Sequence, residues 1–119
     1  MRKFFFVSLL LFMAALFPAS ADILISEVMA SNGYFEEGHA WDWIELYNSG
    51  KSAVDLSGWH LSDSKKDPLK WTFPRGAKLK SGKYLTVWCT GVEGLDPGKG
   101  SQFYAPFAIS AKGETLILS

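Results

Sequence analysis

The chain is built from short runs of β-branched and aromatic residues, which are separated by clusters of Gly, Pro, Asn, Asp and Ser. Breakers such as Asn48-Ser49-Gly50 and Asp96-Pro97-Gly98 suit turns, and they recur at the roughly 8 to 12 residue spacing of β-sandwiches and barrels. No segment shows the apolar period of an ordinary helix. The pattern predicts an all-β fold with strands at residues 23–29, 43–48, 53–56, 59–62, 70–73, 84–89, 107–109 and 115–118. Two connections, 30–40 and 90–105, are too long for tight turns.

The first 21 residues have the composition of a secretory signal peptide. Met1-Arg2-Lys3 supplies a positive start, residues 4–17 are apolar apart from Ser8, and Ala19-Ser20-Ala21 is a small-x-small cleavage pattern. The alternative is a membrane anchor, but this apolar run is shorter than the roughly 20 residues that span a bilayer. We therefore predict cleavage after Ala21, and a mature chain without a transmembrane segment that is secreted, periplasmic or at the cell surface.

The predicted mature chain, 22–119, is long enough for one domain with a modest core. The full chain has 12 basic and 12 acidic residues, and the leader holds Arg2 and Lys3, so the mature chain has a formal charge of −2. This charge does not mark a nucleic-acid binder. Cys89 is the only cysteine, so no intramolecular disulfide can form. Its alternation with Leu85 and Val87 predicts a buried, inert thiol.

The stretch 42–63 has the most particular residue types in the chain. In Trp43-Ile44-Glu45-Leu46-Tyr47, alternation assigns Ile44 and Leu46 to the core face and the other three residues to the opposite face. The Asp and Asn residues at the strand ends can hydrogen-bond to backbone groups of adjacent turns. These residues can therefore be explained as structural fixtures, without a substrate.

Several segments together resemble the lamin tail domain family, in order, from residue 23 to residue 118. They are ISEVMASN at 25–32, DWIELYN at 42–48, VDLSGWHLSD at 54–63, WTFP at 71–74 and FAISAKGETLIL at 107–118. The resemblance implies an immunoglobulin-like β-sandwich of the bacterial exported type, which occurs alone or attached to secreted hydrolases, nucleases or surface proteins. The family continues for another turn and strand, so we expect either a sandwich that lacks its last strand or a fragment of a longer protein.

The resemblance implies a non-catalytic binding or tethering module. The first alternative is an accessory domain of a secreted hydrolase or nuclease whose catalytic part is absent here, and the second is a carbohydrate- or polyanion-binding module. We expect no enzymatic activity, because neither His39 nor His60 stands in a Ser-His-Asp order or at zinc-ligand spacing.

We expect no cofactor. A weak calcium site is the one metal hypothesis, since oxygen ligands crowd the connection at Asn32, Glu36, Glu37 and Asp42. Turn capping is the alternative role for the acidic residues.

Two groups of residues are candidates for ligand binding. Trp41, beside the acidic connection, is the tryptophan we expect to be exposed and able to stack on a sugar ring, whereas Trp43, Trp59, Trp71 and Trp88 suit core or edge packing. The second group lies in a basic segment, 64–83, which has seven basic residues and one acidic residue; residues 22–63 have eight acidic and one basic. There we single out Lys78, Lys80 and Lys83 for a polyanion, and expect Lys78 and Lys80 to face the same way. An ordinary solvated edge protected by lysines is the alternative.

The expected partner is a protein or a cell-envelope polymer, and nucleic acid is a weaker candidate. A sandwich without its last strand would also leave unpaired backbone on a sheet edge, which favours self-association or strand addition by a partner.

Overall fold

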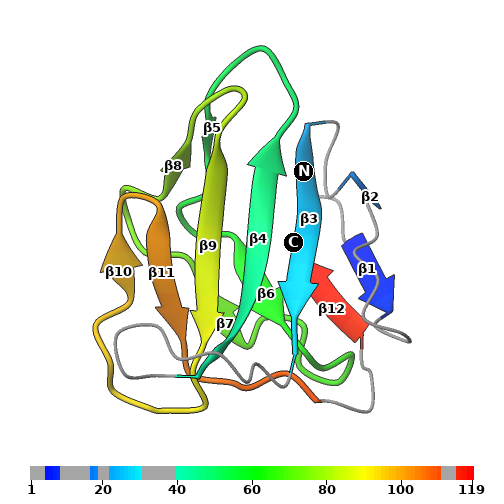
Figure 1. Ribbon diagram of the computed structural model, residues 1–119, viewed down its shortest axis with the longest axis vertical. Helices are drawn as coiled ribbons and strands as arrows, with labels where there is room; N and C mark the ends of the chain where they lie inside the picture. Colours follow the sequence, from blue (N-terminus) through cyan, green and yellow to red (C-terminus); the bar gives the residue numbers. More distant parts are fainter. Residues whose placement is uncertain (1–4, 9–16, 19–21, 31–39, 111–114) are drawn as a thin grey trace.

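The computed structural model describes residues 5–8, 17–18, 22–30, 40–110 and 115–119. Every regular element in this part of the chain is a β-strand, and two sheets lie face to face (Figure 1). One sheet has the order β10-β11-β9-β4-β3-β2 and the other β1-β12-β6-β7, while β5 and β8 form a separate pair. The chain is thus an all-β, immunoglobulin-like β-sandwich, as the sequence predicts.

The centre of the six-stranded sheet is formed by its three longest strands. These are β3 (Ile23–Met29), β4 (Asp42–Asn48) and β9 (Tyr84–Cys89). Alternation buries one face of β4 and of β9, with Ile44 and Val87 opposite each other in register and fully buried. In β3 a bulge between Ile25 and Glu27 shifts the alternation by one residue, so Ile23, Ile25 and Val28 are the buried residues. The flanking strands are β2 (Phe17–Pro18), β10 (Gly98–Lys99) and β11 (Gln102–Ala105).

The second sheet closes the core from the other side. Leu61, Phe73 and Leu116 are at most 1% exposed and pack in the same cluster as the inner face of the six-stranded sheet. Cys89 belongs to this core and its thiol is buried, as predicted. The strands outside the six-stranded sheet are β1 (Phe5–Ser8), β5 (Val54–Asp55), β6 (His60–Ser62), β7 (Trp71–Thr72), β8 (Lys78–Leu79) and β12 (Thr115–Leu118).

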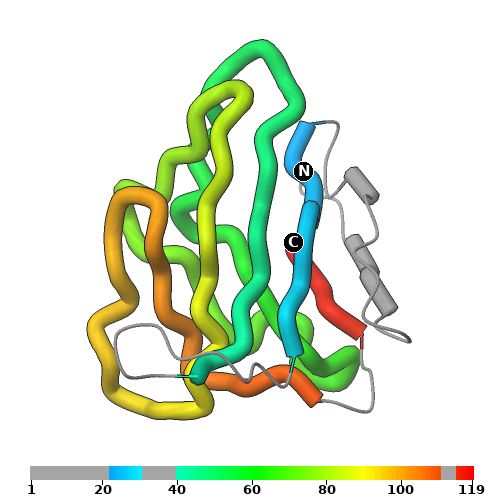
Figure 2. Tube along the Cα trace, viewed as in Figure 1, coloured from blue at the N-terminus to red at the C-terminus, as the bar shows by residue number. Residues whose placement is uncertain are grey.

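The connection 90–105 is not a simple loop, because it contains β10 and β11. The chain leaves β9, returns along β10 and turns again into β11, which runs parallel to β9 (Figure 2). Gly98 permits the close approach of the two arms, since its φ is +92° and a Cβ there would meet the carbonyl oxygen of Gln102. Sequence reasoning missed these strands because four glycines interrupt the run.

The predicted strand at 107–109 is wrong. Phe107 and Ile109 are buried, so the alternation is real, but no ladder forms there. The backbone N–H of Ile109 instead donates to the Asp42 carboxylate, 3.0 Å away. A side chain thus satisfies a group that a neighbouring strand would otherwise satisfy.

The outer edge of β12 is not open in this structure. Phe5–Ser8 pairs with it antiparallel over four residue pairs, from Phe5 opposite Leu118 to Ser8 opposite Thr115. Residues of the predicted leader therefore supply β1 and also β2, and the cleavage after Ala21 stays a prediction. Within the described ranges, no helix is long and apolar enough to cross a bilayer.

Candidate functional site: a lysine-lined groove

The three predicted lysines line one open groove of about 470 Å³. Lys78 and Lys80 are exposed on either side of the buried Leu79, so they face the same way, as expected. Lys83 joins them through the tight turn into β9, where its N–H donates to the carbonyl of Lys80. The full lining is Lys78, Leu79, Lys80, Lys83, Tyr84, Leu85, Gly100 and Ser101.

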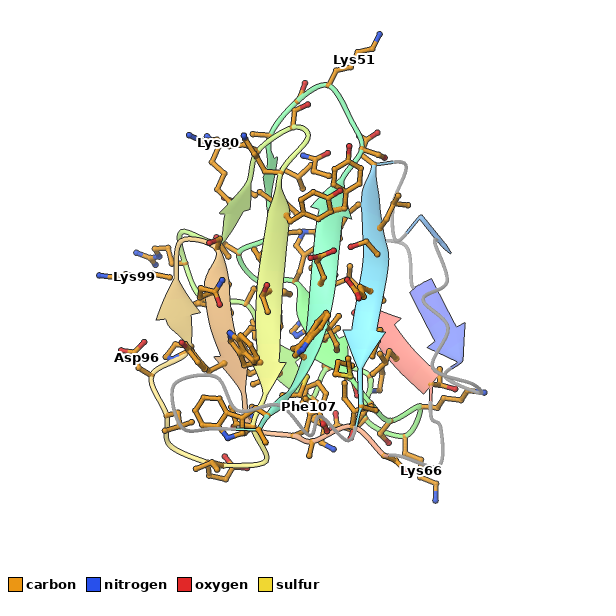
Figure 3. The ribbon with its side chains drawn as sticks, in the orientation of Figure 1. Lys51, Lys66, Lys80, Asp96, Lys99 and Phe107 are labelled. Carbon is orange, nitrogen blue, oxygen red and sulfur yellow. The ribbon has the colours of Figure 1, made fainter. Side chains whose placement is uncertain are left out.

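The groove is electropositive, because its lining contains three lysines and no acidic residue. None of these lysines has a salt-bridge partner among the described residues, where Lys70 and Asp63 form the one ion pair. Asp55 lies opposite Lys78 in the β5–β8 pair, where the charge of Lys78 helps to lower the pKa of Asp55. Lys80 projects away from the body of the protein at the sheet edge (Figure 3). The groove therefore offers unpaired positive charge to a ligand.

Asn48 holds the groove in place from the core. It is fully buried at the end of β4, and its Nδ2 donates to the carbonyl oxygens of Ser52 and Leu79 at 2.8 and 2.9 Å. Its backbone carbonyl accepts from Gly82, and its N–H donates to Lys83. One polar side chain and its backbone thus fix β8 and the lysine turn against the end of β4.

Sequence reasoning missed Tyr84 and Ser101. Tyr84 is 55% exposed at the start of β9 and its ring lies 4.7 Å from that of Tyr47, centroid to centroid. Its position in the outward phase of the β9 alternation is the signal that could have found it. Ser101 reaches the groove through the parallel β9–β11 pairing, where its carbonyl accepts from the N–H of Thr86. The sequence carries no local signal for that long-range pairing.

Trp41 does not lie with the lysines. Its half-buried ring meets Tyr104 edge-on, with centroids 5.9 Å apart and planes at 78°. Because β4 and β9 are antiparallel, with Asp42 opposite Cys89 and Tyr47 opposite Tyr84, Trp41 sits at one end of these strands and the groove at the other. The two groups of candidate residues are therefore separate.

The other tryptophans divide between the two faces of the sheets. Trp71 is buried and Trp59 packs against the core, as expected. Trp43 and Trp88 instead lie opposite each other on the outward face of the six-stranded sheet, and both are half-buried. Packing alone, which the sequence suggested for Trp43 and Trp88, therefore does not account for the position of these two rings.

The strand-end acids act as structural fixtures. Asp55 Oδ1 accepts from the N–H and the hydroxyl of Ser57, at 2.9 and 2.5 Å. These hydrogen bonds, the hydroxyl first, and then the charge of Lys78 lower the pKa of Asp55 below its ordinary value. Asp42 accepts from Ile109 and Asp63 pairs with Lys70 at 2.7 Å.

The calcium hypothesis falls mostly outside the described residues, because Asn32, Glu36 and Glu37 lie in 31–39. Within the part of the chain that the structure covers, no three His, Cys, Asp or Glu side chains gather closely enough to hold a metal ion. His60 contacts Thr72, with Nδ1 and Oγ1 3.0 Å apart, and His39 is outside the described residues.

Comparison with models of protein families identifies the family of this chain. The model of the Lamin Tail Domain (LTD) family matches residues 17–119. This match covers most of the chain, which therefore belongs to the lamin tail domain family. No curated protein matches the sequence.

Proposed function

We propose that this member of the lamin tail domain family is a non-catalytic binding module that tethers an anionic polymer of the cell envelope. Residues 1–21 direct its export and are then removed. The groove carries the proposal, because three lysines without ion-pair partners line one open concavity together with the exposed Tyr84. The strand-end acids Asp55 and Asp42 accept hydrogen bonds from the backbone N–H groups of Ser57 and Ile109, which supports a structural role for them.

The groove chemistry selects the ligand class. Lysine ammonium groups are compact point charges that suit phosphate or carboxylate groups without demanding a fixed bidentate geometry. The groove is open, and its Lys80 projects at the edge of the molecule (Figure 3), so an extended chain can pass along it. A polymer with repeating anionic groups satisfies all three lysines at once, and its binding releases counterions.

A charge-matched pair of variants tests the proposal. Lys78, Lys80 and Lys83 are changed together to Gln, and the control carries Gln at the exposed Lys65, Lys66 and Lys70. Figure 3 shows Lys66 at the opposite end of the molecule from Lys80. Both variants lose three positive charges, so any difference between them reports the groove.

Binding to immobilised polyphosphate and to an immobilised polyuronate is then measured at about 50 and about 200 mM salt. We expect wild type and the control variant to bind and to weaken steeply with salt, and the groove variant to lose most of its affinity. Equal losses in the two variants would show general charge attraction, and no binding by wild type would reject the proposed ligand class.

A further inference from the structure

The geometry points to a second binding surface, on the outward face of the six-stranded sheet, that takes a neutral glycan chain. This surface is defined by Trp43, Trp88 and Tyr104, with the polar side chains of Glu45, Thr86 and Gln102 beside them. It shares no residue with the lysine groove, and it does not rest on the function proposed above.

The strand register puts the three aromatic rings in one row. Trp43 of β4 is opposite Trp88 of β9, and Trp88 is opposite Tyr104 of β11. Neighbouring strands are about 4.8 Å apart, so the row spans roughly 10 Å across three strands. All three side chains are half-buried and belong to the outward phase of the alternation, and Trp41 extends the row through its edge contact with Tyr104.

A second row, made of hydrogen-bonding side chains, lies beside the aromatic row. Its members are two residues away from the aromatic residues on the same three strands. Glu45 is opposite Thr86, and Thr86 is opposite Gln102. Internal hydrogen bonds orient this row, since Trp88 Nε1 donates to Gln102 Oε1 at 2.7 Å and Ser26 Oγ donates to Glu45 Oε1 at 2.9 Å. The surface is thus organised before any ligand arrives, which lowers the entropy cost of binding.

Sugar chemistry matches this arrangement. One face of a pyranose ring presents C–H groups, which are attracted to the electron-rich face of an indole or phenol ring, while its hydroxyls need donors and acceptors at the ring edge. Aromatic rings in one row and polar groups in the next supply both. Ligand sites commonly combine aromatic walls with a few placed polar groups in this way.

The charged side chains on this face favour a neutral glycan over nucleic acid or a protein as the ligand. On β3, β4, β9 and β11 the outward side chains include Glu27 and Glu45 but no lysine or arginine, and Lys99 of β10 projects from the sheet edge (Figure 3). A stacking surface for nucleic acid combines its aromatic rings with basic residues, which this face lacks. The core of a protein interface is depleted of charged residues, whereas Glu45 lies between the aromatic positions.

The test is migration through native gels that contain a soluble neutral polysaccharide (β-glucan, galactomannan or xylan), together with pull-down on cellulose and chitin. The variants are Trp88→Ala, Tyr104→Ala and Gln102→Ala, each checked for folding by thermal melting. The matched control is the triple Gln variant of Lys78, Lys80 and Lys83. Gln102 is exposed, so its variant keeps the test decisive if Trp88→Ala does not fold.

We expect at least one polysaccharide to retain the wild type, with affinity reduced about tenfold or more by Trp88→Ala or Tyr104→Ala and less by Gln102→Ala. The lysine variant and high salt should leave retention unchanged. The inference is overturned if no neutral polysaccharide retains the wild type, if folded Tyr104→Ala and Gln102→Ala bind normally, or if retention disappears with salt or in the lysine variant. Failure of the lysine groove to bind polyanions would leave this result unaffected.

Discussion

Asn48 shows how one residue at a strand end can organise a distant surface. Its side chain makes three hydrogen bonds in the core, as donor to Ser52 and Leu79 and as acceptor from the N–H of Gly50. Loss of the side chain would leave the buried Leu79 carbonyl without this donor, which costs more than the net value of an ordinary hydrogen bond.

We therefore predict that Asn48→Ala lowers the free energy of unfolding by about 2 to 4 kcal/mol, measured by urea denaturation. Asn48→Asp should also destabilise, because it keeps the size but removes both donors. Ser49→Ala is the control, since its exposed hydroxyl makes a single bond to the Asp22 carbonyl, and we expect it to cost no more than about 0.5 kcal/mol. An Asn48→Ala variant as stable as the Ser49→Ala variant would contradict this role.

Asp55 gives a prediction about pH. Its folded-state pKa is lowered from the ordinary 3.8, first by the Ser57 hydroxyl, then by the Ser57 N–H, and also by Lys78. A lowered folded pKa means that the carboxylate stabilises the fold above the unfolded value and that this contribution is lost as pH falls through the folded value.

The melting temperature of wild type should therefore exceed that of Asp55→Asn at pH 6, and the two should converge below about pH 3. Because Asp55 is fully exposed, the difference should be small. A difference that stays constant across this range would show that protonation of Asp55 does not change the stability of the fold.

At the level of elements, the sequence predicts strands well where alternation is local. The bounds of β3, β9 and β12 match the predicted 23–29, 84–89 and 115–118, and β4 begins one residue earlier than expected. Periodicity gave a wrong strand at Phe107 and Ile109. Both side chains are buried in alternation, but their backbone does not pair with a neighbouring strand. Periodicity also failed for β11, whose parallel pairing with β9 depends on partners distant in the chain.

The candidate site was only partly predictable for the same reason. Alternation placed Lys78 and Lys80 on one side of β8, and this part is local. The contribution of Ser101 to the groove requires the β9–β11 pairing, and the row of Trp43, Trp88 and Tyr104 requires the register of three strands. Register depends on how whole strands bury one face, so no short window of the sequence contains it.

At the scale of the whole molecule, pairing between segments partly disperses the uneven charge of the chain. The acid-rich segment 22–63 and the basic segment 64–83 meet where Asp55 pairs with Lys78 across β5 and β8, and where Asp63 binds Lys70. Lys80 and Lys83 have no such partner among the described residues, which leaves the groove as the basic surface. Pairing between these segments therefore disperses only part of the charge asymmetry.

The edge of β12 gives a prediction for the processed protein. This edge is covered by Phe5–Ser8, so removal of residues 1–21 would free the backbone groups of Thr115–Leu118. Two freed β12 strands can pair antiparallel about a two-fold axis, because each presents the same edge. We propose that the protein self-associates through β12 once the leader is cleaved.

Sedimentation of the unprocessed and processed chains over a range of concentrations measures this. We expect the unprocessed chain to be monomeric and the chain from Asp22 to form a dimer that dissociates on dilution. Ser119 exchanges both backbone hydrogen bonds with His60 on the β6 side, so the N–H groups of Leu116 and Leu118 point to the β1 side. Hydrogen exchange at these two amides should therefore slow when the dimer forms. A processed chain that stays monomeric at every concentration would show that the free edge of β12 does not support pairing between two copies.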